Sequence, residues 1–268
     1  MTRSADQILL IDVGNTQTVL GVLERDEIAS RISLATDQSR TADEYAALLL
    51  PLMHQNRVDP ESISGCLVSS VVPPLNPTFR RLAETLFDTE AIFVEPGIKT
   101  GMPIRYDNPT EVGADRIVNA VAAREIFGSP VVVVDFGTAT TFDLVDIKGA
   151  YAGGIIAPGV GISAEALFAQ ASKLYQVDLR RPQSLVGKST ASAMQSGIYF
   201  GYLSLVDGIL DRLKEECPEL ENVVATGGRA ELLADDSRHV NHVDYLLTLK
   251  GLEVVYRKNR QLFGAVSR

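Results

Sequence analysis

The sequence of 268 residues contains no tryptophan and only two cysteines, Cys66 and Cys217. Two cysteines this far apart argue against a disulfide framework and fit a reducing compartment. No segment approaches the roughly 18 consecutive apolar residues that a transmembrane helix needs. The first residues, MTRSADQ, also lack the apolar core of a secretory signal. We therefore expect a cytoplasmic protein that does not bind a membrane.

Positive charge is scarce as well. Lys and Arg number 25 against 34 Asp and Glu, which gives a net charge of −9 and a pI near 4.9. This balance argues against a nucleic-acid-binding surface. Apolar residues make up 46% and charged residues 22%, as in ordinary globular domains. The length allows one large domain or two smaller ones. Enzymes acting on anionic substrates stay compatible with the composition, since backbone amides and a few local cations can hold an anion.

A short apolar run that ends in an acid opens the ordered part of the sequence. Ile8–Ile11 is too short to span a membrane and predicts a buried strand that ends at Asp12. Gly14 then permits a tight turn and a close approach of backbone amides to a ligand. The small polar residues around it favour phosphate binding, and Asp12 is placed to hold a hydrated divalent metal. An ordinary strand and hairpin turn explains this segment alone equally well.

The same pattern returns in the second half of the chain. VVVVDFGTATTFDLV, aligned on Asp135, repeats the apolar run, the acid, the glycine and the hydroxyl residues. The order of predicted elements repeats too, which indicates an internal duplication. The sequence therefore predicts an α/β fold of two ribonuclease-H-like lobes, residues 1–128 and 129–268, with the final helix packing back on the first lobe. Each lobe is expected to hold a mixed five-stranded sheet flanked by helices, with a nucleotide in the cleft between lobes. The turn at Gly227-Gly228 would cradle its adenosine.

Pattern and capping signals predict the individual elements. Strands are expected at 8–11, 18–24, 28–35, 65–72, 91–94, 131–134, 142–147, 150–157 and 222–225. Helices are expected at 42–54, 77–87, 115–127, 163–174 and 190–216, with a further one around Ala230. Thr41 and Glu44 form a capping box, and Asn76 is expected to cap the helix that Pro77 begins. His239 and His242 have no acid or cysteine cluster of metal-binding spacing beside them, so we expect a surface pair.

Four motifs occur in an order that resembles one family. Asp12–Thr16, Gly113–Arg116, Asp135–Thr141 and Gly153–Gly159 closely resemble the type III pantothenate kinases. These belong to the superfamily of actin, sugar kinases and 70-kDa heat-shock ATPases, and the resemblance runs from Ile8 to the final helix. It implies an ATP-dependent phosphorylation of pantothenate to 4'-phosphopantothenate, the first step of coenzyme A biosynthesis. It also implies Mg²⁺, a monovalent cation (K⁺ or NH₄⁺), and a homodimer that completes its substrate pocket at the dimer interface.

The resemblance assigns roles position by position. The ATP-phosphate loop would be Asp12, Val13, Gly14, Asn15, Thr16, Gln17, Thr18 and Val19, with Thr138 as a second ATP contact. Asp115 would be the proton acceptor, and pantothenate would be bound by Tyr106, Gly113, Ala114, Asp115, Arg116 and Thr190. Asp135 would bind the monovalent cation, and Asp12 would reach Mg²⁺ through water.

Simpler interpretations stand beside these roles. Asp115 is also a helix first-turn acid of the kind that favours the helix dipole, and Thr190 is also a candidate N-cap. Arg116 suits either a substrate carboxylate or developing phosphate charge. For the whole chain, the alternatives are a kinase for another small alcohol or carboxylate and a non-catalytic ATP-binding regulator. A substrate screen separates the first, because a fold does not name its acceptor. The intact Asp115 and both phosphate turns argue against the second.

Overall fold

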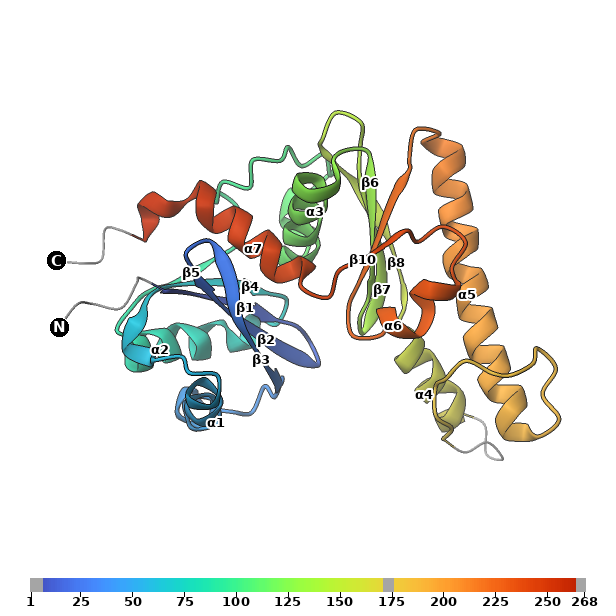
Figure 1. The fold of residues 1–268 in the computed structure, drawn as a ribbon, viewed down its shortest axis with the longest axis horizontal. Helices are drawn as coiled ribbons and strands as arrows, with labels where there is room; N and C mark the ends of the chain where they lie inside the picture. The colour runs from blue at the N-terminus through green and yellow to red at the C-terminus, as the bar shows by residue number, and fades with distance from the viewer. Residues whose placement is uncertain (1–6, 171–175, 264–268) are drawn as a thin grey trace. The chain divides into compact units, whose positions relative to one another are not determined.

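The computed structural model describes residues 7–170 and 176–263 (Figure 1). These residues form two compact units. The first unit joins residues 7–122 with 247–263, and the second comprises the described residues from 123 to 246. Each unit contains one five-stranded mixed sheet flanked by helices. The expected α/β class with two such sheets is therefore confirmed.

The sheet of the first unit has the order β3-β2-β1-β4-β5. Its strands are β1 (Gln7–Val13), β2 (Gln17–Glu24), β3 (Glu27–Ala35), β4 (Ile63–Ser70) and β5 (Ala91–Phe93). The hairpin β1-β2-β3 is antiparallel, whereas β4 runs parallel to both β1 and β5. Because β1 and β4 are parallel neighbours, their carboxyl ends lie side by side at the same end of the sheet.

Helices cover both faces of this sheet. They are α1 (Ala42–Gln55) and α2 (Asn76–Phe87) on one face and α7 (Leu247–Lys258) on the other. The start of α3 (Ala114–Phe127) packs on α7, since a Cβ at Gly251 would lie 2.0 Å from the carbonyl oxygen of Val118. Leu9, Ile11 and Val13 join the core that contains residues of α1 and α2. Because side chains alternate along a strand, Leu10 and Asp12 project to the other face. That face is covered by α7, whose Leu249 lies against Gly21 of β2.

The second unit repeats the first. Its sheet has the order β10-β9-β6-β7-β8. In this order β8, β7, β6, β9 and β10 occupy the places that β3, β2, β1, β4 and β5 have in the first sheet. The strands are β6 (Val131–Phe136), β7 (Ala139–Val145), β8 (Tyr151–Pro158), β9 (Asn222–Thr226) and β10 (His242–Val243). The helices are α4 (Val160–Gln170), α5 (Thr190–Glu216) and α6 (Ala230–Leu233). Single 3₁₀ turns lie at Pro60–Ser62, Pro73–Leu75, Pro109–Glu111, Ala234–Asp236 and Arg260–Leu262.

Most predicted boundaries agree with the structure to within about two residues, but the expected N-cap of α2 was wrong. The predicted capping box of α1 is confirmed: the amide of Thr41 donates to Glu44 Oε2 at 2.8 Å, and the amide of Glu44 donates to Thr41 Oγ1 at 3.3 Å. Asn76 is not a cap. The 3₁₀ turn Pro73–Leu75 runs straight into α2, so Leu75 takes the N-cap position and Asn76 is already helical.

Two other expectations also need correction. The helix expected at 163–174 begins earlier, at Val160, and is described as far as Gln170; residues 171–174 lie outside the described residues. The strand expected at 142–147 begins at Ala139, because β7 pairs with β6 almost from the turn. Among the helices within 7–170 and 176–263, none combines the length and apolarity that a membrane crossing requires.

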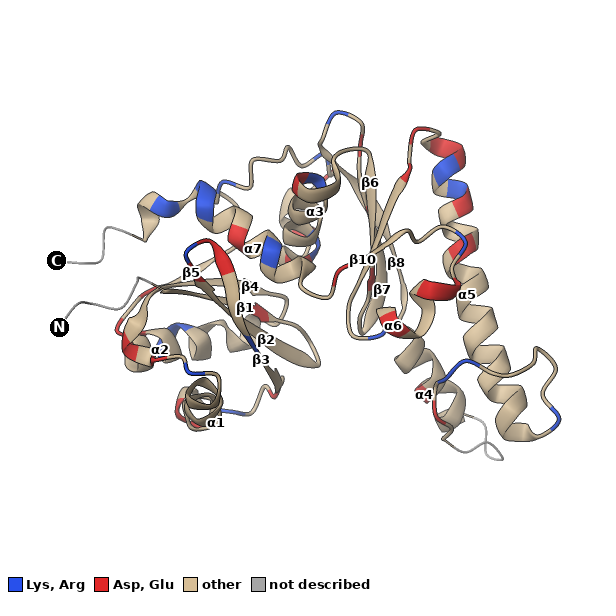
Figure 2. Cartoon of the chain, in the orientation of Figure 1, with Lys and Arg blue, Asp and Glu red and all other residues tan. Residues whose placement is uncertain are grey.

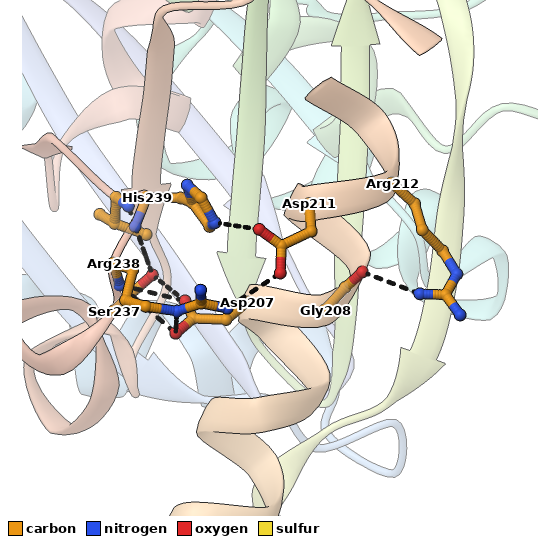
Figure 3. A network of polar contacts seen from close by, with 8 residues as sticks. Asp207, Gly208, Asp211, Arg212, Ser237, Arg238 and His239 are labelled. Atoms are coloured by element: carbon orange, nitrogen blue, oxygen red, sulfur yellow. Dashed lines mark hydrogen bonds and ion pairs between the residues drawn. The ribbon is translucent and has the colours of Figure 1, made fainter. Parts of the chain in front are cut away.

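A polar network fastens the second half of α5 to the segment before β10 (Figure 3). Buried Asp207 accepts hydrogen bonds from Ser237 Oγ at 2.7 Å and from Nε of Arg238 at 3.1 Å. One turn later, Asp211 accepts from Arg238 at 2.9 Å and contacts His239 Nε2 at 2.7 Å. These bonds lower the pKa of the Asp211 carboxyl, and the bond with His239 has the largest effect.

The two histidines are therefore not an exposed surface pair, and that expectation was wrong. His239 is only 15% exposed in its side chain and is engaged by Asp211. His242 lies in β10, where its ring stacks 4.5 Å from the ring of Phe127. Each histidine has a separate structural partner, so the two do not act as a unit.

Candidate active site

The turn between β1 and β2 has the compact form expected of a phosphate loop. The amide of Gly14 donates to the carbonyl of Gln17 at 3.1 Å, which closes the turn. A Cβ at position 14 would lie only 2.9 Å from that carbonyl oxygen, so the turn needs glycine. Asn15, Thr16 and Gln17 are exposed. The tip of the loop is thus open to a ligand.

Other residues assigned to the loop support it from inside. Val13 belongs to the core. Thr18 is fully buried, and its hydroxyl bonds the hydroxyl of Thr36 at 2.8 Å. The amide of Thr36 also donates to the carbonyl of Thr16. These contacts fix the loop conformation, whereas Val19 is only half-buried.

Asp12 lies where two parallel strands end. It is half-buried and in register with Ser69 of β4. The ladder continues one step beyond the strands, since the amide of Val71 donates to the carbonyl of Val13 at 3.1 Å. In open α/β sheets, ligands bind at the carboxyl ends of the strands. Asp12 is therefore at the expected end of its sheet.

The start of α3 packs against the same strand ends. A Cβ at Gly113 would lie 3.4 Å from Val71 Cγ1 and 2.5 Å from Asp115 Oδ1. Glycine at this position thus leaves room for the carboxylate of Asp115 beside the segment that follows β4. Ala114 is half-buried. The first unit alone brings together Gly113–Arg116 and the end of β4, which lies beside Asp12.

The electrostatic surroundings of Asp115 suit a base. Burial raises the pKa of its carboxyl, although a hydrogen bond from the amide of Arg116, at 2.7 Å, and the guanidinium charge act in the other direction. The Arg116 side chain is itself buried. A carboxylate that binds its proton more tightly than usual is a better proton acceptor near neutral pH.

Two predicted substrate contacts come from different units. Tyr106 is half-buried in the loop before the 3₁₀ turn Pro109–Glu111 of the first unit. Thr190 is the exposed first residue of α5 in the second unit and lines a groove of about 850 Å³. Its alternative role as N-cap was wrong, because Ser189 forms the capping box with Ser192.

In the second unit, three glycine turns meet around Asp135 and Thr138. The amide of Gly137 donates to the carbonyl of Ala139 at 3.1 Å and closes the turn after β6. Gly159 packs on Thr138, where a Cβ would lie 2.2 Å from its carbonyl oxygen. Gly227 packs on Asp135, where a Cβ would lie 2.3 Å from Oδ1. The half-buried Asp135 and Thr138 thus share one compact set of turns.

Sequence reasoning did not single out Ser69. This residue is fully buried at the carboxyl end of β4 and pairs with Asp12. The sequence did contain a signal for Ser69. The apolar residues of β4 are followed by Ser69-Ser70, just as the apolar run Ile8–Ile11 is followed by Asp12. The prolines that follow indicate where the strand ends, but not which face its last side chains occupy.

Comparison with known proteins identifies the family. The family model for type III pantothenate kinase matches residues 8–212. A type III pantothenate kinase of Koribacter versatilis (strain Ellin345) is 50% identical over 263 residues, which cover 94% of this chain and 96% of that protein. The chain belongs to the type III pantothenate kinase family.

Membership makes the chain a kinase that phosphorylates pantothenate with ATP, in coenzyme A biosynthesis, and a kinase of this kind uses a divalent metal with its ATP. The predicted family, reaction and substrates are therefore confirmed.

Solved structures agree on the fold of the kinase. A Baf family protein from Campylobacter jejuni is similar with a TM-score of 0.60 at 21% identity, over 95% of this chain and all of that one. The activator of 2-hydroxyisocaproyl-CoA dehydratase from Clostridium difficile, solved with bound ADPNP, gives a TM-score of 0.54 at 13% identity, over 96% and 97% of the two chains. At these identities the likeness establishes the fold alone.

Proposed function

We propose that this kinase transfers the γ-phosphoryl group of ATP to the primary alcohol of pantothenate, with Asp115 as the general base. The observation that carries this assignment is the position of Asp115, whose motif packs against the end of β4, the strand paired with β1 and Asp12. Asp115 orients the acceptor hydroxyl and takes its proton as the oxygen–phosphorus bond forms. General base assistance of this kind contributes about 10²- to 10⁴-fold in rate.

The donor is held by the two phosphate turns. Asp12–Val19 supplies amides and small polar side chains to the phosphates, and Thr138 adds a second ATP contact. The exposed tip Asn15–Gln17 supports this role. Phosphoryl transfer has a loose transition state, so positioning and charge stabilisation do most of the work. Tyr106, Gly113, Ala114, Arg116 and Thr190 hold pantothenate beside the base. Arg116, always cationic, pairs with the substrate carboxylate or with phosphate charge.

The acids at the ends of β1 and β6 fit two different cations. Within 7–170 and 176–263, no three His, Cys, Asp or Glu side chains gather as a ready-made metal site. Mg²⁺ keeps several waters and needs few protein ligands when a polyphosphate supplies the rest, so the single carboxylate of Asp12 suits it. Asp135, packed on the Gly227 turn, offers oxygen to K⁺ or NH₄⁺. Mg²⁺ would neutralise phosphate charge at the transferred group.

Potassium dependence tests the role of Asp135. We expect Asp135→Ala to lose most of the activation that wild type shows when sodium is exchanged for potassium, because its cation ligand is gone. The measurement is turnover against potassium concentration at constant ionic strength. Asp235→Ala is the control, because Asp235 is an exposed acid of the same unit. Asp143 would not serve, because it is buried and its carboxylate is bonded to Tyr151. An unchanged potassium titration in Asp135→Ala would remove this residue as the ligand.

The kinase is also proposed to act as a homodimer in the cytoplasm, where its two free cysteines stay reduced. Exposed apolar side chains gather on two neighbouring parts of the second unit: Ile155 and Ile156 on the edge strand β8, and Ile162 and Leu167 on α4. The first half of α5, Thr190–Val206, carries no charged residue (Figure 2). Large exposed apolar patches mark interaction sites, and a second copy of the chain fits this one.

The dimer proposal predicts that Ile156→Asp is monomeric. Ile156 is 63% exposed within one chain, so the substitution should leave the fold intact and harm only a contact between copies. Sedimentation velocity measures the effect. Ile147→Asp is the matched control, because Ile147 is 59% exposed but lies in the hairpin turn after β7. A wild-type protein that sediments as a monomer at micromolar concentration would contradict the proposal.

A further inference from the structure

Ser69 carries a buried hydroxyl whose hydrogen-bonding capacity is unused. Its exposed fraction is 0%, and its Oγ has no hydrogen-bond partner among the described residues. A buried hydroxyl without a partner costs stability and is uncommon in folded proteins. Ser70, the next residue, differs, because its hydroxyl accepts a hydrogen bond from the amide of Val72 and supports the turn. The unused hydroxyl of Ser69 therefore points to a ligand.

The position of Ser69 indicates which ligand. Cys66 and Val68 face the core that contains α1 and α2, so by alternation Ser69 projects to the opposite face, as Asp12 does on β1. The two residues are in register on neighbouring strands, which lie about 4.8 Å apart. A group bound to the carboxylate of Asp12 is thus within reach of the Ser69 hydroxyl.

The duplicated fold provides an independent comparison. Asp135 pairs with Thr226 on β9 as Asp12 pairs with Ser69 on β4. Thr226 is also buried, at 2% exposure. Both units therefore place a buried hydroxyl side chain beside the acid at the next-to-last position of β1 or β6. The sequences of β4 and β9 are otherwise different, ISGCLVSS against NVVAT. A buried hydroxyl on the strand beside the acid is thus a feature that the two units share.

We propose that Ser69 is a positioning residue that accepts a hydrogen bond from a water in the shell of the Mg²⁺ ion held by Asp12. This inference rests on the proposed role of Asp12. Metal-bound water is a strong donor, and a hydroxyl oxygen has two lone pairs to accept with. Ser69 fixes one water of the shell and thereby the orientation of the metal toward the phosphates. It makes no bond to the reacting atoms.

Direct metal binding tests the proposal. The full chain is titrated with Mn²⁺, a paramagnetic substitute for Mg²⁺, in the presence of a non-hydrolysable ATP analogue. Electron paramagnetic resonance measures the concentration of free Mn²⁺ at each step. We expect Ser69→Ala to raise the Kd for Mn²⁺ about three- to tenfold, the effect of one lost hydrogen bond. The KM for pantothenate should stay the same. The Tm without ligands should not fall, because the variant removes a hydroxyl that bonds to none of the residues that the structure describes.

Two further variants make the test specific. Ser69→Thr keeps the hydroxyl, as Thr226 does in the second unit, and should keep Mn²⁺ affinity within about twofold of wild type. Ser30→Ala removes another buried hydroxyl oxygen that has no partner within 7–170 and 176–263. Ser30 lies on β3 in register with Val22, away from Asp12, so this variant should leave Mn²⁺ affinity unchanged.

Different outcomes separate the inference from the function on which it rests. If wild type binds no Mn²⁺ with the nucleotide, the role of Asp12 fails. If wild type binds it and Ser69→Ala binds it equally well, the role of Ser69 is wrong. A Ser69→Ala variant that changes only the KM for pantothenate would place the hydroxyl on the acceptor and would also overturn the inference.

Discussion

Asp115→Asn should bind ATP with nearly wild-type affinity and turn over about 10²- to 10⁴-fold more slowly. The amide oxygen of asparagine can still accept the hydrogen bond that the amide of Arg116 gives to Asp115, so the local geometry is kept while the base is lost. ATP affinity is measured by calorimetry and turnover by release of ADP. Near-wild-type turnover would mean that another residue accepts the proton.

The pH dependence of the same variant gives a second test. Because burial raises the pKa of Asp115, wild-type kcat/KM should fall on the acidic side at a pH above the ordinary range for an aspartate. This acidic limb should be absent from the residual activity of Asp115→Asn. Glu111→Gln is the control, since Glu111 is an exposed acid shortly before the motif, and its pH profile should match wild type.

A rise in pH should change the stability contributed by Asp115 in the opposite direction to its effect on activity: the stability falls while the activity increases. A raised pKa means that the folded protein binds this proton more tightly than the unfolded chain. Its stabilising contribution is therefore complete below the ordinary aspartate pKa and is lost as the pH rises through the raised value. Asp115→Asn has no such proton to lose. Relative to wild type, its free energy of unfolding in urea should thus be higher at pH 8 than at pH 4.

Gly227→Ala should disrupt the turn after β9 and, through it, the second phosphate turn at Asp135, on which Gly227 packs. Gly227 has φ +91°, and its Cβ would lie 2.3 Å from Asp135 Oδ1 and 2.8 Å from backbone atoms of Phe136. Strained backbone of this kind costs about 1–3 kcal/mol, so the free energy of unfolding should fall by at least that amount. The displaced Asp135 should also weaken potassium activation, and ATP affinity should fall about tenfold or more. Urea unfolding and calorimetry measure these effects.

The neighbouring glycine is the matched control. A Cβ at Gly228 would meet no atom of the described residues within 4 Å, and the φ of Gly228 lies outside the left-handed range. Gly228→Ala should therefore retain both stability and potassium activation. Equal losses in the two variants would show that the turn tolerates no side chain for reasons other than the contact with Asp135.

The fold could be predicted because the same sequence pattern occurs in both halves of the chain. Two apolar runs that end in Asp-x-Gly each predict a buried strand followed by a tight turn, and the structure places Asp12 and Asp135 at equivalent points of two sheets. Local capping signals also predicted the start of α1, where the Thr41 and Glu44 side chains bond to nearby backbone. Such signals are contained in a few adjacent residues.

Features that depend on contacts distant in the sequence could not be predicted. His239 looked like a surface residue because its partner, Asp211, lies 28 positions away. The error at Asn76 has a local cause instead, because the preceding prolines form a 3₁₀ turn that continues directly into α2. The position of Ser69 beside Asp12 depends on the register between β4 and β1, which join segments more than 50 residues apart. The side chain of Thr18, assigned to the ATP loop by resemblance, proved to be bonded to Thr36 inside the protein.

We propose that this chain phosphorylates pantothenate with ATP at a site built around Asp115. The most direct measurement is ADP release by the wild-type protein with Mg²⁺-ATP in potassium buffer, with and without pantothenate, together with the mass of the product. We predict ADP formation that depends on pantothenate and a product heavier by one phosphoryl group. ADP release that is unaffected by pantothenate, or that occurs only with another small alcohol, would contradict the account.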